Sequence, residues 1–125
     1  MYNAQSPDTT DSGIEREIQA KGLTAPRVTM ADIEAAIASE HYFTAREGCE
    51  GACGGNGGPY HVSLGLLTFC VLVLKNGFSV TGESACASPE NYDAAIGRKI
   101  ARENAKQKLW PLLGYALKNR LTGSA

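Results

Sequence analysis

Three basic residues in one stretch of the sequence are the first candidates for binding chemistry. Arg98, Arg102 and Lys106 recur every four residues, so they share one side of a predicted helix. Guanidinium groups recognise phosphate and carboxylate groups through paired hydrogen bonds. The alternative is a solvated helix face whose charge Glu103 partly balances. We take Arg98 and Arg102 as candidate contacts to an anionic ligand.

Three polar residues of a predicted strand complete this candidate site. Ser79, Thr81 and Glu83 alternate along the sequence, so they share one face of the strand. The helix that carries Arg98 and Arg102 is expected to lie near this face. We therefore predict that the five residues bind one ligand together, in a pocket that a second subunit completes.

Cysteines and histidines suggest two further kinds of chemistry. Cys49, Cys53 and His61 are zinc-ligand types, but a single C-x3-C pair lacks the second half of a zinc motif. The alternative is a pair of unligated thiols in a mobile loop. Cys86 lies just before a predicted helix N-terminus, where thiolates are stabilised, so it is the candidate nucleophile of a small cysteine-dependent enzyme. The alternative is a small buried apolar side chain, and we predict no metal and no cofactor.

A central antiparallel β-hairpin must position these residues. Two runs rich in apolar residues, 64–75 and 78–84, flank Asn76-Gly77, the signature of a two-residue type I′ turn. The predicted core face of the hairpin carries Phe69, Val71, Val73, Phe78 and Val80. The other face carries Thr68, Cys70, Leu72, Leu74, Ser79, Thr81 and Glu83. Because this other face is half apolar, we expect another element or a second subunit to cover it.

The elements before the hairpin are predicted from capping and composition. Residues 1–27 are expected to form a flexible N-terminal arm with a short helix, and residues 28–122 a single α+β domain. Within that domain the sequence predicts a helix over 29–40 that begins at a threonine N-cap. A short aromatic strand at 41–45 and a glycine-rich loop at 46–61 follow.

A long C-terminal helix is predicted over residues 89–110, with a kink at Pro111. One side of this helix is expected to pack on the predicted core face, and it carries Tyr92, Ile96, Ile100 and Trp110. A second side is made of small residues that permit close backbone approach to a sheet or a partner helix, namely Gly97, Ala101 and Ala105. The predicted fold class is therefore α+β: an N-terminal helix, a short strand, the hairpin and the long helix.

Composition narrows the function classes. The chain has 125 residues, a hydrophobic fraction of 43% and a net charge of −1, which is typical of one globular domain. Without a basic excess, nucleic acid is not an expected partner. No apolar stretch has the length of a membrane span or the position of a signal peptide, so we expect no membrane partner and a cytoplasmic location.

Three segments of the sequence carry a family resemblance. They are Leu-Lys-Asn-Gly-Phe at 74–78, Thr-Gly-Glu-Ser-Ala-Cys-Ala-Ser-Pro at 81–89 and Gly-Arg-Lys-Ile-Ala-Arg-Glu-Asn-Ala at 97–105. With them, most of residues 29–121 resembles a family of small tailed-bacteriophage and prophage proteins of unknown function, the gene product 49 / gene 66 family. The resemblance implies a phage-encoded accessory protein that acts in the cytoplasm of the infected bacterium.

Three functional hypotheses follow. The first is a counter-defence protein that sequesters a nucleotide-type immune signal in a pocket between subunits of a homo-oligomer. The second is a protein–protein module that docks on a host enzyme or a phage component through the face that carries Leu72 and Leu74. The third is the small enzyme built on Cys86, for which no spacing places His41 or His61 as a base. We favour binding over catalysis.

Overall fold

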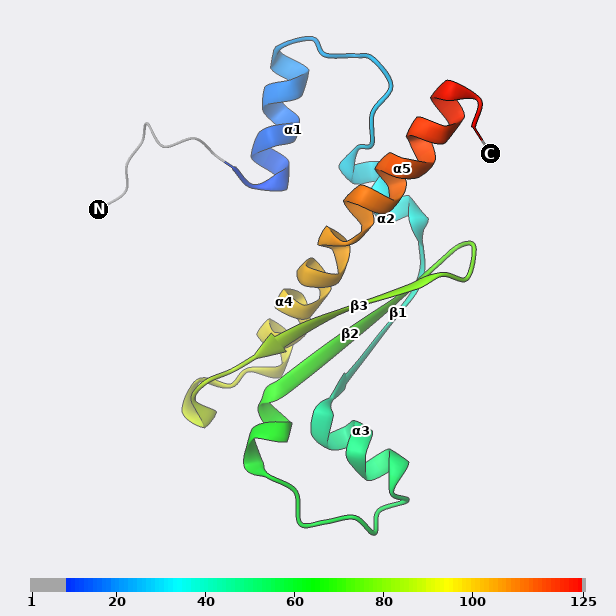
Figure 1. The fold of residues 1–125 in the computed structure, drawn as a ribbon. Coiled ribbons are helices and arrows are strands. Elements are labelled where there is room, and N and C mark those ends of the chain that lie inside the picture. Colours follow the sequence, from blue (N-terminus) through cyan, green and yellow to red (C-terminus); the bar gives the residue numbers. More distant parts are fainter. Residues whose placement is uncertain (1–8, 125) are drawn as a thin grey trace, which may run out of the picture.

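The sheet and the C-terminal helices define the architecture. The structure is a computed structural model that describes residues 9–124. Three antiparallel strands lie in the order β1-β2-β3, with β1 over Ile37–Thr44, β2 over Leu67–Leu74 and β3 over Ser79–Ala85. Helices α4 (Ala94–Gln107) and α5 (Leu109–Thr122) form one long, bent rod that crosses one face of this sheet (Figure 1). The predicted α+β fold class is confirmed.

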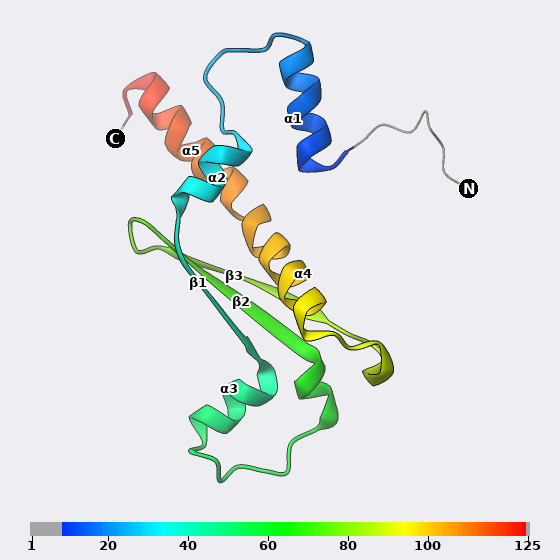
Figure 2. The ribbon, with the colours of Figure 1, turned by 180° about the vertical axis from the view of Figure 1, so that it is seen from behind.

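Shorter elements surround this frame. Helix α1 spans Asp11–Ala20, α2 spans Met30–Ala36 and α3 spans Ala45–Ala52, and two 3-10 helices, η1 and η2, span Val62–Leu66 and Pro89–Asn91. Figure 2 shows α2 beside α5 and α1 at the same end of the molecule, with α3 at the opposite end. No helix in the described part of the chain is both long enough and apolar enough to cross a membrane.

Helix α2 begins as predicted but ends earlier. The Thr29 hydroxyl accepts a hydrogen bond from the amide of Asp32, and the Asp32 carboxylate accepts one from the amide of Thr29. The helix stops at Ala36, because the chain from Ile37 pairs with β2 as a strand. The predicted strand at 41–45 was therefore too short.

The segment at 46–61 is only partly a loop. Thr44 and Glu47 form a second capping box, with the Thr44 hydroxyl accepting from the Glu47 amide at 3.1 Å and the Glu47 carboxylate accepting from the Thr44 amide at 2.8 Å. This cap begins α3, which runs to Ala52. The prediction of a glycine-rich loop over the whole range is wrong for its first half, since the capping box starts a helix there despite Gly48 and Gly51.

The hairpin is confirmed, but its register differs from the predicted one. Leu74 pairs with Phe78, so the loop holds three residues, and Gly77 takes the left-handed conformation with φ 89°. Strand β3 then has Val80 opposite Leu72 and Ser79 opposite Val73. A shift of one residue turns every side chain of β3 to the other face.

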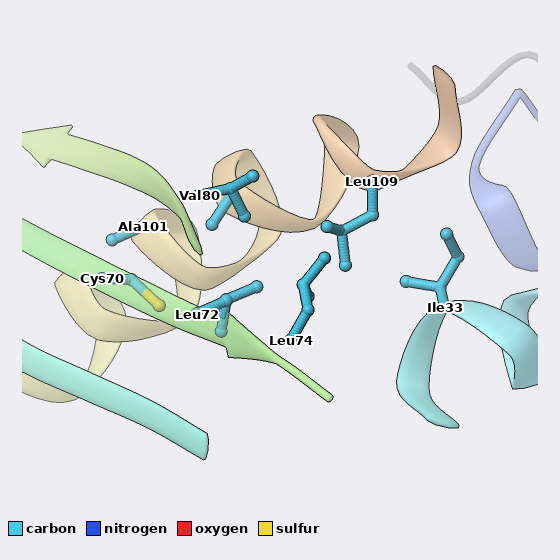
Figure 3. Close-up of a cluster of buried hydrophobic side chains, with 8 residues drawn as sticks. Ile33, Cys70, Leu72, Leu74, Val80, Ala101 and Leu109 are labelled. Atoms are coloured by element: carbon cyan, nitrogen blue, oxygen red, sulfur yellow. The ribbon is translucent and has the colours of Figure 1, made fainter. Parts of the chain in front are cut away.

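Helix α4 covers the face of the sheet that carries Leu72 and Leu74, and not the predicted core face. Cys70 and Leu72 are fully buried and Leu74 is 7% exposed, beneath α4 and the start of α5 (Figure 3). The other members of the core are Ile33, Val80, Ala101, Ala105 and Leu109. The predicted core face of Phe69, Val71 and Val73 is instead half-buried and faces away from α4. Docking through Leu72 and Leu74 is excluded by their burial.

Small residues decide which side of α4 meets the sheet. Gly97, Ala101 and Ala105 are buried, and Gly82 of β3 lies directly beneath the backbone of Ala101 and Ala105. A Cβ on Gly82 would overlap the Ala101 carbonyl oxygen and the Ala105 amide nitrogen. The close approach predicted for the small residues is therefore confirmed.

The larger apolar residues of the predicted helix do not pack on the sheet. Ile96 and Ile100 are 56% and 46% exposed. Tyr92 and Trp110 are half-buried, and only Trp110 contacts the core. The prediction was wrong here because bulky side chains would hold the helix away from the strand that Gly82 lets it approach.

The long helix starts later than predicted and is bent as predicted. Its N-cap is Asp93, whose carboxylate accepts a hydrogen bond from the amide of Ile96, and residues 89–91 form a separate 3-10 turn. The bend lies at Lys108, between α4 and α5. Pro111 explains this position, because its ring nitrogen has no hydrogen to donate to the carbonyl of Gln107, where α4 ends.

Candidate functional site

Arg102, one of the predicted ligand contacts, is held by carboxylates of the chain itself. Its Nε donates to Glu40 of β1 at 2.9 Å, and its Nη2 donates to Glu34 of α2 at 2.8 Å. Lys106, one turn later, lies 2.9 Å from Glu34 and 3.2 Å from Glu103. The two cations therefore join α4 to α2 and β1.

The pKa values of the acids reflect this pairing. Hydrogen bonds from Arg102 and then Lys106 lower the pKa of Glu34 to about 2. A hydrogen bond from Arg102 also lowers the pKa of Glu40. Both carboxylates are thus ionised at neutral pH, and they occupy the donors that a bound anion would need. We conclude that Arg102 has a structural role in this arrangement.

The predicted strand residues lie on the other side of the sheet. Ser79, Thr81 and Glu83 share the face of Phe69 and Val71, which turns away from α4. The sheet therefore separates them from the arginines, and the five predicted residues do not line one pocket. The cause is the one-residue register shift at the three-residue loop.

Arg98 lies at a hollow that the sequence did not predict. The hollow has a volume of about 130 Å³, and it lies where β1 and β2 meet α3 and the first turns of α4. Its lining residues are Tyr42, Phe43, Thr44, Glu47, Thr68, Tyr92 and Arg98. Arg98 is exposed, and within the described residues no hydrogen bond or ion pair holds its guanidinium. Its donors are therefore available to a ligand.

Thr68 gives this hollow an unsatisfied polar group. The residue is 3% exposed, and its Oγ1 is the buried side-chain atom that has no hydrogen-bond partner in the described chain. A Cβ on Gly97 would lie 3.1 Å from this oxygen, so glycine lets α4 pack closely over the hydroxyl. An unpaired buried hydroxyl carries a free-energy cost of about 1–3 kcal/mol, which a ligand hydrogen bond would remove.

The remaining polar groups of the hollow have partners. The Glu47 carboxylate accepts from the Thr44 amide as the cap of α3. The Tyr42 hydroxyl donates to Glu40 at 3.0 Å, and burial followed by this hydrogen bond raises the pKa of the phenol. Tyr42 is therefore neutral at physiological pH. The hollow thus combines one free guanidinium, one free hydroxyl and three aromatic rings.

The candidate zinc and thiol residues are dispersed. Cys49 is half-buried, Cys53 is exposed, and the Nδ1 atom of His61 accepts from the Ser63 amide at 3.1 Å. No group of three or more His, Cys, Asp or Glu side chains able to hold a metal occurs in the part of the chain that the structure describes. The Cys86 thiol donates to the carbonyl of Ser88 at 3.2 Å.

Sequence reasoning found Arg98 but missed the residues around it. Thr68 interrupts an apolar strand with a hydroxyl, and Gly97 is the glycine of α4. A polar residue in a buried strand, opposite a glycine of a packed helix, was the available signal for a small site. This signal identifies a site only when the packing that brings Thr68 and Gly97 together is known.

A comparison with known families decides what kind of protein carries this site. The model of the phage protein family named after N4 Gp49 and phage Sf6 gene 66 matches residues 28–121, which is well over half of the chain. The chain belongs to this phage protein family. The family region contains the whole hollow, from Tyr42 to Arg98, and begins after α1. No curated protein and no solved structure gives a significant match.

Proposed function

We propose that this phage protein is an accessory binding protein that sequesters a nucleotide-type immune signal of the host cell, at the hollow beside Arg98. The observation that carries the proposal is the pairing of a free guanidinium with an unsatisfied hydroxyl, on Arg98 and Thr68. Membership of a phage family supports an action in the cytoplasm of the infected bacterium.

The chemistry of the hollow matches the parts of a nucleotide. Arg98 would bind a phosphate group through paired hydrogen bonds. The rings of Phe43 and Tyr92, which line the hollow, offer surfaces for stacking a base. The Thr68 hydroxyl, in the wall of the hollow, would bond to a ribose or base atom. No nucleophile or base is needed for capture, so the proposal is binding and not catalysis.

The size of the hollow supports an oligomeric site. Its volume of about 130 Å³ is below the ~300 Å³ at which pockets for small molecules begin. A second copy would supply the missing wall. The adjoining face of the sheet suits such a contact, because Phe43 is 38% exposed and stacks on Phe69 with 5.5 Å between ring centres.

Native mass spectrometry and calorimetry test this function directly. The full chain is purified from cells with an active nucleotide-signalling defence, and the purified protein is then titrated with a panel of cyclic and linear nucleotides. We expect an oligomer with added mass of nucleotide size at each site, and binding heat for at least one nucleotide.

Two variants make the test specific to the hollow. Arg98→Ala should abolish the added mass and the heat, whereas Lys99→Ala removes an adjacent exposed cation that does not line the hollow and should bind normally. A protein that carries no nucleotide and gives no heat with any of the panel would overturn the proposal. Equal losses in both variants would show that the charge of the helix matters and the hollow does not.

A further inference from the structure

We propose that the outer edge of β3 binds an extended segment of a partner protein, which adds to the sheet as a fourth strand. Strand β3 lies at one end of the order β1-β2-β3, so one of its edges has no neighbouring strand in the described part of the chain (Figure 1). This surface is separate from the hollow beside Arg98, which lies at the side of β1. The proposal therefore does not depend on the proposed ligand.

Hydrogen bonding along the hairpin shows which groups point outward. The amide of Leu74 donates to the carbonyl of Phe78, and the amide of Cys86 donates to the carbonyl of Leu66. Backbone groups in an antiparallel pair alternate between facing the partner strand and facing away. The even-numbered residues from Phe78 to Cys86 therefore face β2, and the odd-numbered residues present their amides and carbonyls to the outer edge.

One side chain already uses this edge in the way a partner would. Nδ2 of Asn104 on α4 donates to the carbonyl of Glu83 at 2.8 Å. Three residues of β3 keep outward-facing amides and carbonyls with no partner among the described residues, namely Ser79, Thr81 and Ala85. These groups alternate at the spacing that an extended backbone satisfies.

The edge lacks the features that usually prevent strand addition. Natural edge strands are protected by lysine, proline, a β-bulge or a covering element. Strand β3 has no lysine and no proline, pairs with β2 without a register shift, and carries Glu83 as its single charged residue. The strand is therefore open to a partner at Ser79, Thr81 and Ala85, while Asn104 occupies the carbonyl of Glu83.

An apolar groove beside the edge defines the partner's chemistry. Ile96 and Ile100 lie on the same side of α4 as Asn104, and they line a hollow of about 290 Å³ with Ala85 and Cys86. Ile96 is 56% exposed and Ile100 is 46% exposed, so both are free to contact a partner. Alternate side chains of an added strand would enter this groove, which selects apolar residues at every second position.

The charge of the groove indicates which residue should flank the apolar positions of the partner segment. Asp93 is the one charged residue among the described residues that line it, and its carboxylate also accepts the N-cap hydrogen bond of α4. A carboxylate at the end of an apolar groove favours a basic residue next to the apolar positions of the partner segment. The inferred partner is thus an extended, alternately apolar segment with a flanking lysine or arginine.

Selection from a library of random linear peptides displayed on a surface tests the proposal. The bait is the full chain, and selected peptides are titrated by fluorescence anisotropy. We expect peptides with the inferred pattern, and protection of the Ser79, Thr81 and Ala85 amides from hydrogen–deuterium exchange in the complex.

Three variants locate the binding surface. Thr81→Pro removes an outward amide and leaves the bonds to β2 intact, and Ile100→Asp makes the groove polar. Each should weaken binding by about tenfold or more, whereas the matched control Thr81→Val should bind as the natural protein does. If Thr81→Pro does not fold by circular dichroism, Ile100→Asp and the exchange measurement decide the question.

Three results would overturn the proposal. One is a selection that returns no binding peptide, and another is binding that Ile100→Asp leaves unchanged while the outward amides exchange freely. The third is sedimentation equilibrium in which the natural chain associates with itself and Thr81→Pro does not. That result would assign the β3 edge to a second copy of this chain.

Discussion

The guanidinium of Arg102 and the carboxylate of Glu34 form two parallel hydrogen bonds, of 2.8 and 3.2 Å. The pair joins α4 to α2, and the Nε of the same arginine binds Glu40 of β1 at 2.9 Å. One side chain thus links three elements. Because bidentate pairs fix both distance and direction, this link sets how α2 and β1 lie against the long helix.

We expect Arg102→Gln to lower the free energy of unfolding by about 1–2 kcal/mol, because Glu40 loses its charged partner and Glu34 keeps only Lys106. Urea unfolding of the full chain measures the change. Lys21→Gln is the control, since its pair with Glu17 is more than half exposed on both sides and should matter by less than about 0.5 kcal/mol. Equal effects of the two substitutions would contradict the structural role of Arg102.

The stability of the protein should depend on pH between about 5 and 2. The folded pKa of Glu34 is about 2, below the 4.5 of an unpaired glutamate, so its stabilising contribution is present above pH 4.5 and is lost as the pH falls toward 2. Glu15, paired with Arg27, also has its pKa lowered to about 2 and acts in the same range. Glu34→Gln should therefore reduce this acid dependence without abolishing it.

Urea unfolding at a series of pH values measures that dependence. The comparison is between the slopes of unfolding free energy against pH for the natural chain and for Glu34→Gln. An unchanged slope in the variant would show that the pairing of Glu34 contributes nothing to acid sensitivity.

Gly82→Ala should be among the most damaging single substitutions in the sheet. The added methyl group would overlap the backbone of Ala101 and Ala105, which cannot move as a flexible side chain can. We expect a loss of about 3 kcal/mol, measured by thermal unfolding. Gly65→Ala is the control, because nothing lies within 4 Å of its Cβ position. A variant at Gly82 as stable as the control would mean that α4 does not rest on β3.

Thr68→Val should have opposite effects on the stability of the protein and on its affinity for the nucleotide. Removing a buried hydroxyl that has no partner should raise the free energy of unfolding by about 1 kcal/mol. If the hydroxyl contacts the ligand, the same variant should bind the nucleotide less tightly in calorimetry. A variant that is less stable than the natural chain would show that the hydroxyl has a partner in the unliganded protein.

Local signals in the sequence predicted much of the fold. The Thr29 cap, the hairpin around Asn76-Gly77 and the small residues of the long helix each act within a few residues or within one element, and each is confirmed. Which face of the sheet is covered depends on contacts between residues that are far apart in the sequence. Both faces of β2 are apolar, so alternation alone does not tell which one α4 occupies.

The candidate site was predictable only in part, for the same reason. Arg102 is separated by 62 residues from Glu40 and by 68 residues from Glu34, and no spacing rule brings them together. Arg98, one turn earlier on the same side of α4, has no such acid as a partner within residues 9–124. Two arginines with the same local sequence signal thus have different roles, which tertiary contacts decide.

The packing of α4 also governs how the protein tolerates change. Gly97 and Ala101 contact the sheet, and Ile100 borders the groove beside β3. Arg102 pairs with the carboxylate of Glu34 on α2. Three of the four sides of the helix are therefore constrained, each by a different requirement. Ala95 and Lys99, on the fourth side, are exposed and line neither the hollow beside Arg98 nor the groove beside β3. Substitutions in the first turns of this helix are consequently expected mainly at these two positions.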